Sequence, residues 1–202
     1  MKLSTGWIVA ISIFGVVFFM VLIGILTGVS TYNNLVSKEE SVNQQWANVQ
    51  NVYQRRADLI PNLVSTVKGV ANFEKSTLTA VIEARAKATS VNINPKNLDE
   101  ASIQKFQSAQ DGLSSAIGRL MVVVERYPEL KATQNFSELQ AQLEGTENRI
   151  TVERRTFNEA AQAYNTYLRR FPRNIIAGMF GFSKKAYFEA QKGSENAPKV
   201  EF

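Results

Sequence analysis

Side chains that could act as nucleophiles, general bases or metal ligands are few in this chain. Its 202 residues include no histidine and no cysteine, which excludes imidazole bases, thiolate nucleophiles, disulfides and zinc sites of the Cys/His type. The acidic pairs Glu39/Glu40 and Asp99/Glu100 are adjacent in the sequence. Adjacent residues on a helix point in different directions, so these carboxylates are not placed to share a metal ion or a proton. We therefore expect no catalytic, metal-binding or cofactor-binding residue and no cofactor.

Two ionisable residues stand at positions where a helical pattern calls for apolar side chains. These residues are Arg56 and Glu153. They could pair across a helical bundle and fix its register. Alternatively, both lie at the edges of their apolar stripes and reach water through their aliphatic stems. The sequence alone favours the second interpretation.

An uncharged apolar run near the N-terminus determines the organisation of the chain. Residues 7–29 read WIVAISIFGVVFFMVLIGILTGV, and a helix of this length measures about 35 Å, enough to cross a hydrocarbon core of about 30 Å. The run exceeds the roughly 7–15 apolar residues of a secretory signal and ends without an Ala-x-Ala cleavage site. It predicts an uncleaved, single-pass membrane anchor.

The flanks of this run bear on orientation and assembly. Lys2 precedes it, whereas Lys38 is the only nearby basic residue that follows it. The balance is nearly even, and it favours a cytoplasmic N-terminus with the domain outside the cytoplasm. Gly24 and Gly28 form a small-xxx-small pair that could seat a second copy of the helix, although glycine is common in membrane helices.

The rest of the chain shows helical periodicity and no alternation typical of strands. Helical stripes cover residues 32–68, 73–88, 98–127 and 133–170, and the segment 89–95 is predicted to be a loop. Pro61 lies inside the first stripe, where it should bend the helix and free a carbonyl group near Ala57. We expect Trp46 to be a core residue. The first stripe consists of Val42, Trp46, Val49, Tyr53, Arg56, Ile60, Leu63 and Val67.

These observations predict an all-α protein with an N-terminal transmembrane helix followed by an up-and-down antiparallel bundle of long helices. The expected divisions are residues 1–6, a short N-terminal tail; 7–29, the transmembrane anchor; 30–171, the helical bundle; and 172–202, an aromatic and basic tail that packs on the end of the bundle. Residues 1–148 hold 13 basic and 13 acidic side chains, whereas residues 149–202 hold 10 basic and 5 acidic ones. The whole net charge of +5 therefore lies in the last quarter of the chain.

The C-terminal tail allows two interpretations. Its aromatic side chains could cap the bundle while its bases face water, in which case Phe180, Phe182 and Phe188 are buried. Alternatively, the tail touches lipid headgroups or an acidic partner. We favour capping. The residues in question are Phe171, Ile175, Ile176, Met179, Phe180, Phe182, Tyr187 and Phe188, interleaved with Arg169, Arg170, Arg173, Lys184 and Lys185.

Several blocks of sequence, in order along almost the whole chain, resemble the LemA family of bacterial membrane proteins. The most specific block is RRADLIPNLV at residues 55–64. The others are YNNLV at 32–36, VKG at 67–69, EARA at 83–86, YPELKA at 127–132, RRTFN at 154–158, YN at 164–165 and YFE at 187–189. The resemblance implies an up-and-down helical bundle beneath one membrane helix. It implies no catalytic residues, and Phe157 stands where family members often have tyrosine.

The resemblance also implies a cell-envelope protein without an established biochemical activity, and one related magnetosome protein is associated with membrane remodelling. The sequence has no glycine-rich phosphate loop and no G-x-S-x-G nucleophile elbow. We predict a non-enzymatic, membrane-anchored scaffold or adaptor of the bacterial envelope. Its expected partners are membrane lipid, unidentified envelope proteins and a second copy of the chain, but not nucleic acid. The alternative is a membrane-shaping or lipid-surface-binding protein that uses the basic C-terminal segment.

Overall fold

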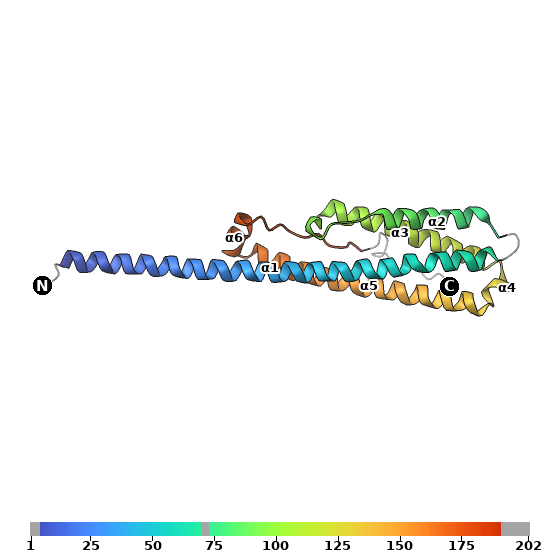
Figure 1. Cartoon of the computed structure of the whole chain (residues 1–202), viewed down its shortest axis with the longest axis horizontal. Coiled ribbons are helices and arrows are strands. Elements are labelled where there is room, and N and C mark those ends of the chain that lie inside the picture. Colours follow the sequence, from blue (N-terminus) through green and yellow to red (C-terminus); the bar gives the residue numbers. More distant parts are fainter. Residues whose placement is uncertain (1–4, 70–72, 191–202) are drawn as a thin grey trace, which may run out of the picture. The chain divides into compact units, whose positions relative to one another are not determined.

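A computed structural model describes residues 5–69 and 73–190, and the regular elements within them are all helical. The chain contains α1 (Thr5–Lys68), α2 (Lys75–Ser90), a 3₁₀ turn η1 (Pro95–Asn97), α3 (Glu100–Val124), α4 (Pro128–Lys131), α5 (Gln134–Arg169) and α6 (Arg173–Met179) (Figure 1). The all-α fold class predicted from the periodicity is confirmed.

The chain divides into two compact units, which we describe separately. The anchor unit comprises residues 1–41 and 163–184, and the bundle unit comprises residues 42–162 and 185–202. The long helices α1 and α5 each contribute to both units.

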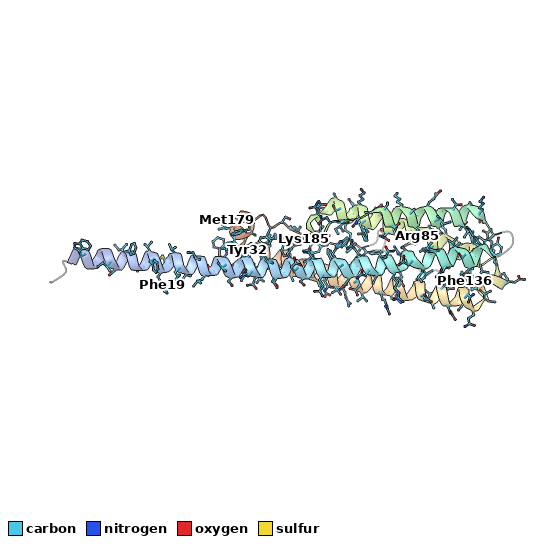
Figure 2. All side chains as sticks on the ribbon, in the orientation of Figure 1. Phe19, Tyr32, Arg85, Phe136, Met179 and Lys185 are labelled. Atoms are coloured by element: carbon cyan, nitrogen blue, oxygen red, sulfur yellow. The ribbon has the colours of Figure 1, made fainter. Side chains whose placement is uncertain are left out.

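In the anchor unit, the first part of α1 presents its apolar side chains outward. All residues from 11 to 27 are exposed, including Phe19, which Figure 2 labels. An 18-residue window of this helix has a mean hydropathy of 2.5, and none of it is buried inside the protein. The helix is therefore long and apolar enough to cross a membrane. Burial begins at Thr31 and Leu35, where the surface of the helix changes from apolar and exposed to packed.

In the bundle unit, α2, α3 and the adjoining parts of α1 and α5 run alternately in opposite directions (Figure 1). Their facing stripes form a hydrophobic core. Its members are Ile60, Leu63, Val64 and Val67 of α1, Leu78, Val81 and Ala88 of α2, Leu113, Ala116, Leu120 and Val124 of α3, Leu130 of α4, and Phe136 and Leu143 of α5. Spacings of three and four residues place each set on one helical face, which is the packing geometry of helical bundles.

Local signals set the ends of several helices. The Asp99 carboxylate caps α3 by accepting a hydrogen bond of 2.8 Å from the Ser102 backbone N–H. That bond lowers the pKa of Asp99 because it stabilises the charged carboxylate. Pro128 begins α4, where its missing N–H costs no helical bond. The loop predicted at 89–95 begins two residues later than expected, because α2 continues to Ser90.

Pro61 lies within α1 and leaves one main-chain acceptor without its helical donor. Proline has no N–H, so the carbonyl oxygen four residues earlier, on Ala57, loses its partner. The Arg85 side chain of α2 supplies the replacement, with its Nε 2.8 Å from the Ala57 oxygen. The prediction that Pro61 frees this carbonyl is thus matched by a donor from a neighbouring helix, and the two helices are joined where α1 lacks a bond.

A double-mutant cycle tests this relationship. Arg85→Met should lower the free energy of unfolding by about 1.5–3 kcal/mol, because it leaves the Ala57 carbonyl without a charged donor. In a Pro61→Ala background, the restored N–H of residue 61 can bond to Ala57, so Arg85→Met should cost less there. Lys87→Met, at an exposed position of the same helix, is the control for lost surface charge. Equal costs of Arg85→Met in both backgrounds would contradict the account.

Candidate functional site

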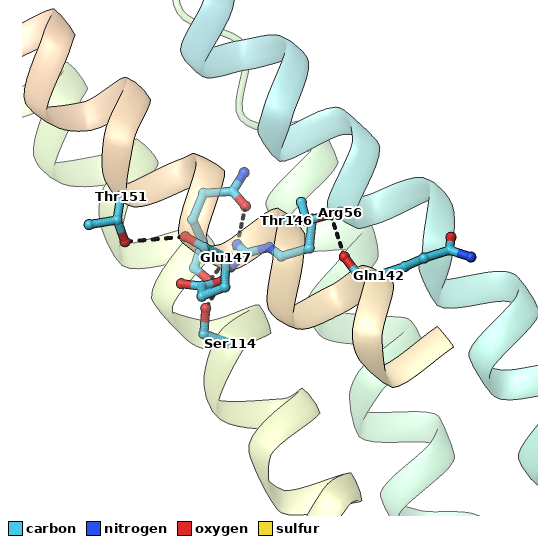
Figure 3. A network of polar contacts seen from close by, with 7 residues as sticks. Arg56, Ser114, Gln142, Thr146, Glu147 and Thr151 are labelled. Carbon is cyan, nitrogen blue, oxygen red and sulfur yellow. Dashed lines mark hydrogen bonds and ion pairs between the residues drawn. The ribbon is translucent and has the colours of Figure 1, made fainter. Parts of the chain in front are cut away.

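The bundle unit contains a buried polar network centred on Arg56, which is only 2% exposed. Its Nη1 donates to Ser114 Oγ at 2.7 Å and to Glu147 Oε2 at 3.0 Å. Its Nη2 donates to the side-chain and main-chain oxygens of Gln110 at 2.8 and 3.1 Å. The guanidinium also lies 5.0 Å from the centre of the Tyr53 ring. Figure 3 shows Arg56 reaching from α1 toward Ser114 of α3 and Glu147 of α5.

The network extends to the remaining long helix of the bundle unit. Gln110 Nε2 donates to the carbonyl oxygen of Ala88 at 3.2 Å. Ala88 is in the last turn of α2, where carbonyl groups have no helical partner. Burial among these groups also raises the pKa of the Tyr53 hydroxyl, because desolvation disfavours the phenolate. One arginine side chain and its acceptors therefore connect α1, α2, α3 and α5.

This arrangement corrects the interpretation of the charged residues on the apolar stripes. Arg56 is buried and paired rather than at a solvated edge, and its partner is Glu147 rather than Glu153. Glu153 is half-buried on the same helix. The Glu147 side chain is 48% exposed, so it reaches the guanidinium from the surface of the bundle. An ion pair between two helices of the bundle unit is therefore present, but the helical stripes did not identify its acidic member.

An aromatic cluster lies farther along α1 in the bundle unit. The Trp46 ring is 5.1 Å from Phe106, 5.7 Å from Phe157 and 6.1 Å from Phe188, measured between ring centres. Tyr53 contacts the same Phe106 ring at 5.1 Å. Trp46 is completely buried, as the stripe on the first helix predicts. Phe188 belongs to the non-helical C-terminal segment, so the cluster is completed by the tail.

The segment around Phe188 is held by its main chain, in a site that we call the tail clamp. The Asn158 side chain accepts from the Phe188 N–H at 2.8 Å and donates to the Phe188 carbonyl at 2.9 Å. The Gln107 side chain makes the same pair of bonds to Glu189: it accepts from the Glu189 N–H at 3.3 Å and donates to the Glu189 carbonyl at 3.2 Å. Arg154 adds a 2.7 Å bond to the Glu189 carbonyl and lies 4.9 Å from the Phe188 ring. Two side-chain amides and one guanidinium thus hold the main chain of a non-helical segment whose phenylalanine fills an aromatic pocket.

Open grooves flank this segment on both sides. One, of about 620 Å³, lies along α5 and is lined by Arg154, Arg155, Asn158, Glu159, Gln162 and residues 187–190. The other, of about 950 Å³, lies along α3 and is lined by residues of α3 between Glu100 and Ser115 together with Tyr187, Glu189 and Ala190. The clamped segment is therefore bordered by space on the α3 side and on the α5 side.

Removing one amide of the clamp should loosen the tail selectively. Asn158→Ala deletes both hydrogen bonds to Phe188, a loss of about 1–3 kcal/mol in the local opening free energy. We expect native-state chymotrypsin to cut after Tyr187 or Phe188 about 5–100-fold faster in this variant. Asn148→Ala, at an exposed position of the same helix, is the matched control. Identical cleavage rates for the two variants would show that the clamp does not hold the segment.

The anchor unit carries a different part of the aromatic tail. Tyr32 of α1 contacts Phe180 and Phe182 edge-to-face, with ring centres 4.9 and 5.6 Å apart. Phe180 is nevertheless 60% exposed, and Phe171, Ile175 and Met179 are exposed as well. The expectation that Phe180, Phe182 and Phe188 are all buried is wrong for Phe180 and holds for Phe188, while Phe182 is half-buried. Lys185, expected to be solvated, is buried, whereas Lys184 is exposed.

Sequence reasoning missed the clamp residues Gln107, Arg154 and Asn158. Amide side chains beside an apolar stripe look like ordinary surface polarity, and nothing in the periodicity marks them. Two of the blocks quoted for the family resemblance, RRTFN at 154–158 and YFE at 187–189, do meet at this site. Among the described residues, no group of three or more acidic side chains is placed to hold a metal ion.

Fold and site together define a class: a helical-bundle protein in which residues 5–69 and 73–190 include one apolar helix that could span a membrane. The chain belongs to the LemA family, whose model matches residues 45–202. Magnetosome proteins MamQ 1 and MamQ 2 of Paramagnetospirillum magneticum are each 26% identical to it over 205 residues, covering 93% of this chain and 74% of their own length. Protein LemA of Metamycoplasma hominis is 24% identical over 181 residues, covering 89% and 79%. These relationships support a membrane-associated protein.

Proposed function

We propose that the protein is a non-enzymatic, membrane-anchored scaffold or adaptor of the bacterial envelope that binds extended segments of other envelope proteins. The N-terminus lies in the cytoplasm and the bundle unit outside it, an orientation that Lys2 and the amino terminus ahead of the anchor favour narrowly over Lys38 behind it. A second copy of the chain is one candidate partner. The apolar helix α1 keeps the bundle unit at the membrane, where such partners are concentrated.

The tail clamp is the observation that carries this proposal. Asn158, Gln107 and Arg154 contact main-chain atoms of residues 188 and 189, and main-chain groups are the same in every peptide. Recognition of this kind gives affinity through the backbone and specificity through one side-chain pocket. The pocket of Trp46, Phe106 and Phe157 accepts a phenylalanine ring. The flanking grooves leave room beside the resident segment.

A photo-crosslinking experiment in native membranes tests the proposal. A photoreactive amino acid at Ser108, in the groove along α3, should form discrete crosslinks to one or a few envelope proteins or to a second copy, identified by mass spectrometry. The same amino acid at Arg119, an exposed position of α3 outside the groove residues, is the matched control. Asn158→Ala should change the yield at Ser108, because it alters how tightly the resident segment holds the site.

The outcomes separate the adaptor from its rival. Crosslinks to lipid alone, or equal yields at Ser108 and Arg119, would reject binding of a protein segment at the clamp. The rival function, binding of a lipid surface by the basic C-terminal region, is favoured by one observation: the exposed apolar side chains of α6 in the anchor unit. Relatives named as magnetosome proteins are compatible with either function.

A further inference from the structure

Helix α6 presents an apolar face that its own unit leaves uncovered. Ile175 and Met179 are 53% and 76% exposed, whereas Ala177 between them is buried. Successive helical residues are about 100° apart, so positions two residues away on either side point away from Ala177. Phe171 before the helix and Phe180 after it are also exposed. Leaving four large apolar side chains exposed to water within ten residues of chain is unfavourable, which indicates that something covers them.

The position of α6 within the anchor unit identifies what covers it. Phe180 contacts Tyr32, and Tyr32 follows the last exposed apolar residue of the run, Val29, by three positions. Three residues correspond to about 4.5 Å along a helix. If the apolar run of α1 lies in the hydrocarbon core, α6 is therefore at the level of the lipid headgroups. Figure 2 labels Phe19, Tyr32 and Met179 on these parts of the anchor unit.

The charges around this face fit an anionic surface. In residues 31–41 and 163–184 there are five basic side chains and two acidic ones, Glu39 and Glu40. Of the bases, Arg169, Arg170 and Lys184 are exposed, and Arg173 lies 4.1 Å from the centre of the Tyr167 ring. Apolar side chains flanked by bases are the pattern of segments that lie in the membrane interface and attract anionic lipids.

We propose that α6 and the aromatic residues on either side of it lie in the headgroup layer of the membrane that α1 crosses, with Phe171, Ile175, Met179 and Phe180 inserted and Arg169, Arg170 and Lys184 near lipid phosphates. The anchor unit then has two contacts with the bilayer, one spanning and one interfacial. This inference shares with the proposed function only the placement of α1 in a membrane and is independent of the tail clamp.

Site-directed spin labelling of the full chain tests the inference directly. The sequence has no cysteine, so one introduced cysteine gives one label. The chain is reconstituted in vesicles of phosphatidylethanolamine and phosphatidylglycerol, and each label's collisions with oxygen and with a water-soluble nickel complex are measured. A label at Met179→Cys should report a depth of about 5–10 Å below the phosphates. Ile175→Cys provides a second, independent position.

Two control positions make each result decisive. Val122→Cys, on an exposed α3 residue of the bundle unit, should report water, and Phe19→Cys should report the hydrocarbon core. A Phe19 label in water would overturn both the anchoring and the α6 proposal. A Phe19 label in lipid with Met179 and Ile175 labels as water-accessible as Val122 would overturn the α6 proposal alone. If the labels at residues 175 and 179 are shielded from both oxygen and the nickel complex, protein and not lipid covers α6, and the α6 proposal is overturned as well.

Charge removal tests the electrostatic part. In the Met179→Cys chain, Arg169→Gln, Arg170→Gln and Lys184→Gln should shift the label toward water, with the ratio of inserted to free label falling about fivefold for each charge removed. In vesicles of phosphatidylcholine alone, the Met179→Cys chain with all three bases intact should show a similar shift of the label toward water. If neither the removal of the bases nor the removal of anionic lipid alters the inserted fraction, the assignment of these bases to lipid phosphates is overturned.

Discussion

Trp46→Ala is expected to lower the free energy of unfolding by about 3–5 kcal/mol. The indole is completely buried and contacts Phe106, Phe157 and Phe188, so truncation removes apolar burial, leaves a cavity and deletes three aromatic pairs. The indole N–H has no hydrogen-bond partner in the described part of the chain, so no polar bond offsets or adds to this loss. Urea unfolding of the full chain in mild detergent, followed by far-ultraviolet circular dichroism, measures the effect.

The position of Trp46 gives this prediction a second readout. Phe188 stacks on the indole at an interplanar angle of 21°, so the cavity should also loosen the clamped segment and speed chymotrypsin cleavage beside it. Val122→Ala is the control, because that side chain is 72% exposed and its loss should change stability by no more than about 0.5 kcal/mol. A cost below about 1 kcal/mol for Trp46→Ala would mean that the aromatic cluster is not a packed core.

The buried seam of α1 is the part of the fold that the sequence predicts best. A strict alternation of three- and four-residue steps can place side chains on one face only in a helix, and Val42, Val49 and Leu63 are completely buried as that pattern requires. Pro61 was equally predictable, because the missing N–H follows from the residue type alone. The donor that replaces it, Arg85, was not predictable, since it depends on which face of α2 meets α1.

The acidic partner of Arg56 was missed for a related reason. The helical pattern marks positions that face the core, and Glu147 does not occupy such a position, because the adjacent Thr146 does. The long arginine side chain crosses the interface to reach a carboxylate at its edge. Choosing between Glu147 and Glu153 requires the relative register of α1 and α5, which no pattern within a single helix encodes.

The tail shows where sequence reasoning ends. Residues 182–190 form no regular element, so no periodicity separates its buried aromatic residues from its exposed ones. Phe180 and Phe188 have the same side chain and similar basic neighbours, yet one is exposed and the other is buried. The difference depends on the surroundings of each ring. Phe188 lies against aromatic rings from three helices, whereas the ring contact of Phe180 among the described residues is with Tyr32.

The second large effect is expected at Arg56, where Arg56→Met should lower the free energy of unfolding by about 2–4 kcal/mol. Methionine keeps most of the aliphatic stem, so the loss comes chiefly from acceptors that lose their donor. Gln110 is 5% exposed, and a buried oxygen without a partner costs about 1–3 kcal/mol. Glu147 and Ser114 are less buried and can turn to water, which limits their share.

Arg55 makes the comparison a sharp one, because it has the same side chain, is the adjacent residue and is exposed. Arg55→Met should change stability by no more than about 0.5 kcal/mol, so the difference between the two variants isolates the buried network from the loss of one positive charge. Glu147→Gln should fall between them, since the amide keeps an acceptor for Arg56 but removes the opposite charge.

Replacement of a buried ion pair by apolar groups is sometimes neutral. An Arg56→Met chain as stable as Arg55→Met would therefore mean that Gln110 finds another donor. The four-helix connection through Ala88, Gln110, Ser114 and Glu147 would then set the register of the bundle without stabilising it.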